Sequence, residues 1–129
     1  MFKDAERPRV GQSAGDLGVR VPNDIQTLGT GNVLPGTGGM SVAPGWRKLP
    51  PHRIPARLQA IAPEACGNTK TYCWRFGEGD FASGRFAAEL DLRLTSAAHG
   101  NVEPAAPMGL AAFEAALAMT RDGWRVDET

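Results

Sequence analysis

Two short segments of the chain carry residue types whose spacing could support chemistry. The first, Gly36 to Arg53, reads GTGGMSVAPGWRKLPPHR and combines a glycine-rich turn, a single serine and a basic run. The second, HGNVEPAAPM, begins at His99 and contains Glu103. A histidine that titrates near neutral pH can act as a general base, and a carboxylate can stabilise a developing oxocarbenium ion. The plainer alternatives are a structural histidine at the start of a strand and a glutamate without a catalytic role.

The basic run places five potential cations within eleven residues, beside Trp46. Such a run could neutralise a pyrophosphate through charge-assisted hydrogen bonds, while the indole ring stacks on a base. Its ordinary alternative is a solvated loop face, because the prolines between residues 44 and 55 bias the chain away from helix. The five side chains are Arg47, Lys48, His52, Arg53 and Arg57.

The glycines at 36, 38 and 39 could suggest a phosphate cradle. No Gly-Lys-Ser or Gly-Lys-Thr ending follows them, and no helix is expected directly after them, although phosphate-binding loops and dinucleotide-binding turns need those features. The pattern alone therefore favours a tight turn that enters a short strand over Met40–Val42, where apolar residues alternate with a serine.

Composition predicts one domain that spans residues 1–129. The 129 residues are 42% hydrophobic, enough for a single core without metals or staples. Fourteen basic and fourteen acidic side chains cancel, so the net charge implies neither a nucleic acid nor an anionic membrane as partner. No apolar run is long enough to span a bilayer, and the segment MFKDAERPRV does not read as a signal peptide. We therefore expect a cytoplasmic protein.

The two cysteines, Cys66 and Cys73, flank the segment GNTKTY and could close a disulfide across a hairpin. Two cysteines in a cytosolic chain are more often free thiols, and we expect free thiols here. A zinc site that combined both cysteines with His52 and His99 would match no standard ligand spacing, so we expect no metal.

Short strands are expected throughout the chain. TYCWRF at 71–76 has the aromatic composition of a strand, and ELDLRL at 89–94 alternates leucines that face a core with charged residues. The glycine-containing segment 77–88 between them reads as a connection. Residues 1–35 read as loops with one or two brief strands, at LGVRV and VL.

One helix is expected, over residues 110–122. Its apolar residues recur at three- and four-residue steps, so it is amphipathic, and Gly123 is placed to cap its C-terminus. Trp124 should then pack back onto a sheet. Short strands followed by one late helix predict an α+β domain.

The order of these segments resembles that of a known family. The GTGGMSV segment, the proline-rich loop ending LPPHR, the HGNVEPAAPM segment and the terminal helix are similar to small bacterial toxins of type VI secretion with an ADP-ribosyltransferase-like fold, and to related standalone bacterial proteins. The shared elements are a Gly-Gly-x-Ser-Val turn and strand and a His-x-x-hydrophobic-x-Pro-Ala-x-Pro-Met segment. They cover about residues 32–125, and the second is the more specific.

The resemblance implies two small antiparallel sheets that form a cleft for NAD. In such a site an arginine on the first strand meets the NAD phosphates, a serine supports the nicotinamide ribose, and a later residue stabilises charge as the glycosidic bond opens. Matched by motif, the serine is Ser41 and the strand-end histidine is His99. Glu103 lies within the second motif, where the compared toxin has no carboxylate. The phosphate-binding arginine is Arg9, with Arg20 as the alternative.

The glycine turn and the basic run then supply further NAD contacts. Gly38 and Gly39 let the backbone approach the ribose, and His52 or Arg53 lines the anion side of the cleft. Arg47 is a further candidate there.

Two functions follow as hypotheses. The first is a toxin or effector that binds NAD and transfers ADP-ribose to an unidentified macromolecular acceptor, or hydrolyses NAD, after delivery into the cytoplasm of a target cell without a signal peptide. Such a toxin also requires an immunity protein as partner. The alternative is a non-catalytic nucleotide- or protein-binding module that uses the same cleft.

Overall fold

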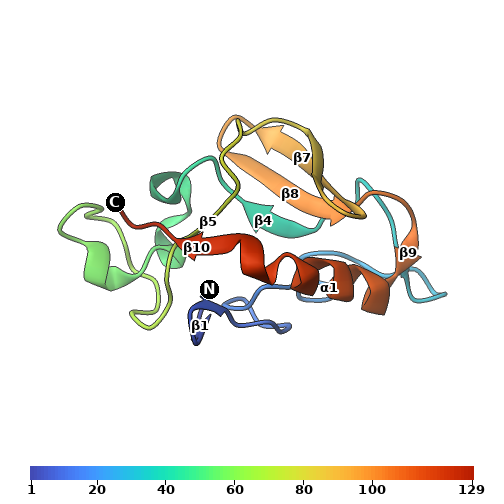
Figure 1. The fold of residues 1–129 in the computed structure, drawn as a ribbon, viewed down its shortest axis with the longest axis horizontal. Helices are drawn as coiled ribbons and strands as arrows, with labels where there is room; N and C mark the ends of the chain where they lie inside the picture. Colours follow the sequence, from blue (N-terminus) through green and yellow to red (C-terminus); the bar gives the residue numbers. More distant parts are fainter.

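A computed structural model describes all residues, 1–129, as ten short strands around a single α-helix (Figure 1). Its largest sheet has four antiparallel strands in the order β4-β8-β7-β6, and three further antiparallel sheets have two strands each. The α+β prediction is confirmed, with four small sheets where two were expected. The strands of the largest sheet are β4 Met40–Val42, β6 Gly84–Ala87, β7 Leu90–Ser96 and β8 His99–Pro104.

The largest sheet has an apolar face and a polar face because successive side chains of a strand point to opposite sides. Met40 pairs with Val102, and Leu90 pairs with Pro104, so these residues share one face. Helix α1, Leu110–Met119, contributes Phe113 and other buried residues to the same core, and it lies below the sheet in Figure 1. The core residues are Leu17, Val19, Ile25, Val33, Met40, Leu90, Val102, Phe113, Ala116, Leu117 and Trp124.

Helix α1 ends three residues earlier than predicted, and Thr120 caps it in place of Gly123. The Thr120 amide and hydroxyl both donate to the Leu117 carbonyl, which tightens the last turn into a 3₁₀ turn, η4, over Arg121–Gly123. Gly123 instead makes room for Phe76, since a Cβ there would lie 2.4 Å from the phenyl ring. None of the helices is long and apolar enough to cross a membrane.

The two-stranded sheets tie distant parts of the chain together. Trp124 pairs with Phe76 and packs against its ring, as predicted for this tryptophan. The N-terminal strands lie below α1 in Figure 1. The pairs are β1 Lys3–Asp4 with β2 Arg7–Pro8, β3 Asn32–Val33 with β9 Met108–Gly109, and β5 Trp74–Phe76 with β10 Trp124–Val126.

Three local predictions require correction. LGVRV, residues 17–21, forms no strand, although Leu17 and Val19 are buried in the core as loop residues. The predicted connection over 77–88 contains β6, which pairs with β7. Of the predicted strand 71–76, only the last three residues are extended in a sheet.

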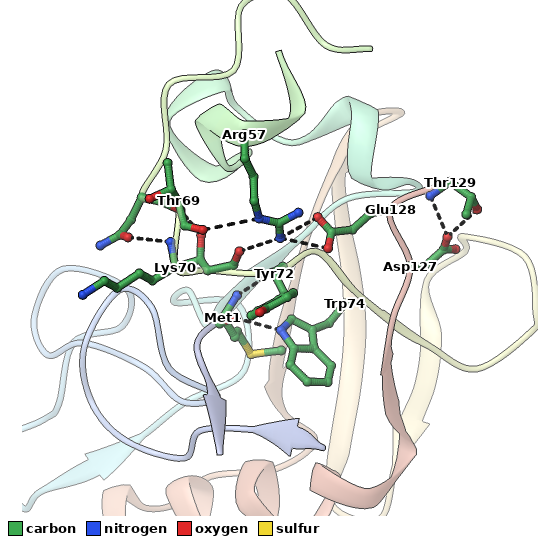
Figure 2. Close-up of polar contacts among 11 residues, drawn as sticks. Met1, Arg57, Thr69, Lys70, Tyr72, Trp74, Asp127, Glu128 and Thr129 are labelled. Carbon is green, nitrogen blue, oxygen red and sulfur yellow. Dashed lines mark hydrogen bonds and ion pairs between the residues drawn. The ribbon is translucent and has the colours of Figure 1, made fainter. Parts of the chain in front are cut away.

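The proline-rich segment contains three short 3₁₀ helices, and contacts with the C-terminal tail hold it in place. Figure 2 shows Arg57 reaching the Thr69 carbonyl and the carboxylate of Glu128, and Arg57 also donates to the Thr71 carbonyl at 3.0 Å. Both cysteines are free, as predicted, and Cys73 is buried while Cys66 is exposed. The 3₁₀ helices are η1 Trp46–Lys48, η2 Pro51–Arg53 and η3 Ala56–Leu58.

Candidate functional site

The polar face of the four-stranded sheet gathers most of the catalytic residues proposed from the sequence. Strand alternation places them on the side away from α1, and antiparallel pairing brings β4 beside β8 although about 60 residues separate the two strands in the chain. We call this surface the polar sheet face. It consists of Ser41, Arg85, Asp91, Arg93, Thr95, His99, Asn101 and Glu103.

A row of three polar residues crosses the polar sheet face. Ser41 pairs with Asn101, and Asn101 pairs with Arg93. Ser41 is exposed and Asn101 is half-buried, and neither side chain forms a hydrogen bond within the chain. The row therefore offers a hydroxyl, an amide and a guanidinium to a ligand, across about 10 Å of sheet.

His99 begins β8, two residues before Asn101 and therefore on the same face. Its Nδ1 lies 2.5 Å from the Thr95 hydroxyl, and that hydroxyl also donates to the His99 carbonyl at 3.2 Å. These contacts fix the imidazole at the end of the sheet, so that Thr95 engages one ring nitrogen. The Nε2 atom has no partner within the chain and is the one available for proton transfer.

Glu103 lies on the same face but is buried, with only 5% of its side chain exposed. Its carboxylate accepts hydrogen bonds from Arg93 Nε, at 3.0 Å to each oxygen, and from the Gly36 amide at 2.7 Å. The hydrogen bond to Glu103 raises the pKa of the Arg93 guanidinium. Glu103 thus anchors an arginine and a loop, and its oxygens are not directed at an open surface.

Gly38 and Gly39 form the turn that enters β4, and their close approach is to the chain's own backbone. Gly38 has φ +121, and a Cβ there would lie 2.2 Å from the Asp24 carbonyl oxygen. A Cβ at Gly39 would lie 2.1 Å from the Val102 carbonyl oxygen. The packing of this turn against two other segments already requires glycine at both positions.

Arg9, the arginine assigned to the phosphates, lies in the N-terminal loop and outside the polar sheet face. Its Nε donates to the Asp16 carboxylate, and the guanidinium stacks on Phe2, 4.5 Å from the ring centroid. Burial tends to raise the pKa of Asp16, but the hydrogen bonds from Arg9 and Ser13 outweigh that effect and lower it. Arg9 therefore closes a local turn.

The alternative, Arg20, is likewise engaged by a carboxylate. Its Nε and Nη2 donate to Asp24 at 3.2 and 2.9 Å, and these contacts raise the pKa of the arginine. Arg20 also lines a shallow pocket of about 330 Å³ beside Val19 and Glu114. No residue of the polar sheet face lines that pocket.

The basic run lies outside the polar sheet face as well. The His52 and Arg53 side chains form no hydrogen bond or ion pair with it, and Arg57 is committed to the C-terminal tail, as Figure 2 shows. Arg47 Nη1 donates to the Ile61 carbonyl and lines a second pocket, of about 460 Å³. No hydrogen bond or ion pair therefore joins His52 or Arg53 to Ser41 and the rest of the row.

The N-terminal loop contains a serine in a sequence motif typical of hydrolases. Residues Gly11–Gly15 read GQSAG and match the Gly-x-Ser-x-Gly pattern of hydrolases. The Ser13 hydroxyl contacts the Asp16 carboxylate at 2.7 Å, and no histidine contacts Ser13. Because the required strand, sharp turn and helix are missing around it, this serine is part of a structural turn.

Two residues of the row, Arg93 and Asn101, were not predicted as site residues from the sequence. The alternation over 89–94 predicted that its leucines face a core, and it assigned no role to the charged residues between them. The same alternation carried the missing signal, because it places Arg93 on the face opposite the core.

The chain was compared with known proteins at three levels. No protein-family model, no curated protein and no solved structure matches it. The arrangement of the polar sheet face is therefore the basis for assigning a function.

Proposed function

We propose that the row of Ser41, Asn101 and Arg93 on the polar sheet face, with His99 beside it, binds NAD and that the protein is an ADP-ribosyltransferase-like toxin or effector, which transfers ADP-ribose to a macromolecule or hydrolyses NAD. One observation carries the proposal: strand pairing brings the Ser41 motif and the His99 motif together on one solvent-facing surface. The sequence resemblance assigned these two motifs to the same site.

The residues present fit such a ligand chemically. Ser41 and Asn101 can donate to and accept from ribose hydroxyls, because neither is used within the chain. Arg93 offers a cation for phosphate, and His99 can hold or release a proton at Nε2. When bound, NAD supplies the glycosidic bond between ribose and nicotinamide. The role of the chain's own residues is to orient the ribose and to stabilise the charge that develops beside it.

A second candidate, a non-catalytic nucleotide- or protein-binding module, is favoured by one specific observation. The Glu103 carboxylate is buried and already accepts hydrogen bonds from Arg93 and Gly36. It is therefore not free to stabilise an oxocarbenium ion or to activate an acceptor. The other carboxylate of this face, Asp91, is paired with Arg85 at 3.1 Å, so binding without turnover is the simpler use of the same surface.

Calorimetry with NAD, followed by measurement of nicotinamide release over hours, distinguishes the two candidates. The enzyme predicts binding with slow release, and the binding module predicts binding alone. Ser41→Ala should weaken or abolish both signals while leaving the melting temperature unchanged, since the side chain is exposed. Thr27→Ala is the matched control, because it also removes an exposed hydroxyl that has no hydrogen-bond partner and Thr27 lies outside the polar sheet face. Absence of NAD binding at millimolar concentration would refute the proposal.

Expression in a bacterial cytoplasm tests the toxin component. Wild-type protein should arrest growth, and Ser41→Ala or His99→Ala should relieve the arrest while the variants accumulate in folded form. Harmless expression of the wild type would contradict the toxin assignment, and a binding module would remain.

A further inference from the structure

Arg93 combines a buried carboxylate partner with free terminal nitrogens. Its contact to Glu103 uses Nε alone, so both terminal nitrogens are free of partners within the chain. Arg9 also donates through Nε to a buried carboxylate, that of Asp16, but its Nη2 contacts the Ser13 hydroxyl at 3.5 Å. The Arg93 side chain is 54% exposed, whereas that of Glu103 is 5% exposed. A buried carboxylate thus holds the inner edge of the guanidinium and leaves its outer edge toward solvent.

Glu103 is itself fixed from a second direction. The Gly36 amide donates to Oε2 at 2.7 Å, from the loop that joins β3 to β4. A carboxylate that accepts from both an amide and a guanidinium has little freedom to rotate. The orientation of Arg93 is therefore set before any ligand arrives, which reduces the entropy lost on binding.

Comparison with Arg85 shows what this anchoring adds. Arg85 lies on the same face and also uses Nε, at 3.1 Å from Asp91. The side chain of its partner, Asp91, is 35% exposed. Arg85 itself lies on the edge strand β6 and outside the row that contains Ser41. Arg85 carries the same charge and the same type of contact, without the buried anchor.

The free edge of a guanidinium matches an anion with two oxygen acceptors. Two parallel N–H groups bind a phosphate or diphosphate more specifically than the single point charge of a lysine. The Ser41 hydroxyl and the Asn101 amide extend the same row, so a ribose attached to that anion would meet hydrogen-bonding groups in turn. Because Glu103 partly offsets the positive charge, we expect an affinity in the millimolar range for the anion alone.

We propose that Arg93 is a diphosphate-binding residue and that Glu103 is the positioning residue that holds it. The inference rests on the proposed function for the identity of the natural ligand. The anion site itself follows from the geometry of Arg93, Glu103 and Gly36. It gives Glu103 a role in orientation and assigns the phosphate contact to β7, in place of Arg9 or Arg20.

Titration of the ¹⁵N-labelled protein with inorganic pyrophosphate, and separately with ADP-ribose, tests the proposal by NMR. Both should shift the Arg93 Nε–Hε signal and the Asn101 amide. Arg93→Gln should weaken both affinities about tenfold, and the matched control Arg85→Gln should leave them within about twofold. Arg93→Lys keeps the charge and should still lose several-fold in affinity, which keeps the test valid should the glutamine variant fail to fold. Equal effects of the two glutamine variants would overturn the assignment.

Glu103→Gln tests the positioning role, because Glu103 does not reach the ligand. Removing the carboxylate charge would by itself strengthen pyrophosphate binding, so the weakening of about fivefold that we expect reports lost orientation of Arg93. The variant should also speed solvent exchange of the Arg93 Nε–Hε proton, which a role confined to stability would not change in a folded variant. Unchanged or stronger affinity would refute positioning. Pyrophosphate binding without NAD binding would support the anion site and refute the proposed function. NAD binding that is insensitive to Arg93→Gln would support the proposed function and refute the anion site.

Discussion

The polar sheet face and the basic segment of residues 46–57 both present arginines and a histidine, but they hold them by different means. In the sheet, backbone hydrogen bonds between β4, β8 and β7 define the scaffold, and the Ser41 and Asn101 side chains remain free. In the segment, the backbone turns irregularly through 3₁₀ helices, and Arg47 and Arg57 stabilise it by donating to carbonyl groups.

The difference shows that density of charge along the chain does not by itself decide which polar groups remain available to a ligand. Five cations within eleven residues are distributed over loops, and Arg57 serves structure. The row on the sheet is assembled from residues far apart in the chain, and regular pairing leaves its polar groups available. The following substitutions separate structural from binding roles in these two regions.

Gly39→Ala should have the largest effect on stability. The new Cβ would meet the Val102 carbonyl oxygen at 2.1 Å and push β4 away from β8. We expect a loss of about 3 kcal/mol in the free energy of unfolding, measured by urea denaturation. Gly45→Ala is the control, because Gly45 is extended at φ −163 and no atom lies within 4 Å of its Cβ position. Similar losses in both variants would contradict the packing described for this turn.

Arg57→Ala should come second. The substitution leaves Glu128, whose side chain is 14% exposed, without its cation, and it removes the contacts to the Thr69 and Thr71 carbonyls. We expect a loss of about 2 kcal/mol, with NAD affinity unchanged. A loss of NAD affinity in the folded variant would instead assign NAD binding to the basic segment.

The pH dependence of Cys73 is the third and smallest effect. Burial raises the pKa of its thiol from 9.0 to about 11. The folded state therefore holds a proton that the unfolded state releases, so this contribution to stability is complete below pH 9 and is lost as the pH rises toward 11. Between pH 9 and 10 the wild type should lose about 1 kcal/mol more than Cys73→Ala.

Cys66 provides a comparison within the same chain, since it is exposed whereas Cys73 is buried. A thiol reagent should label one cysteine in the native protein and two after unfolding. Labelling of both in the native state would contradict the burial of Cys73.

Local sequence patterns were enough to predict the elements in which apolar residues recur at regular spacing. The alternation of leucines predicted β7, the three- and four-residue steps predicted α1, and Met40–Val42 is a strand as expected. The strand β6 was missed because Gly84 and its neighbours have the composition of a connection, and its pairing with β7 decides its conformation. The early end of α1 depends on the Thr120 hydroxyl, which no periodicity describes.

Only part of the candidate site could be predicted from the sequence. Ser41, His99 and Glu103 were proposed as catalytic residues and lie on one face, because their strands pair. The engagement of Arg9 by Asp16 and of Glu103 by Arg93 and Gly36 depends on contacts between segments, and residue types alone carry no such information. For the same reason the sequence did not identify Arg93.

Mapping the NAD-binding surface by NMR titration of the ¹⁵N-labelled wild-type protein tests the central claim most directly. The account predicts that the largest shifts fall on the amides of Ser41, Arg93 and Asn101, while residues 46–57 change little. Absence of shifts at millimolar NAD, or shifts confined to residues 46–57, would contradict it.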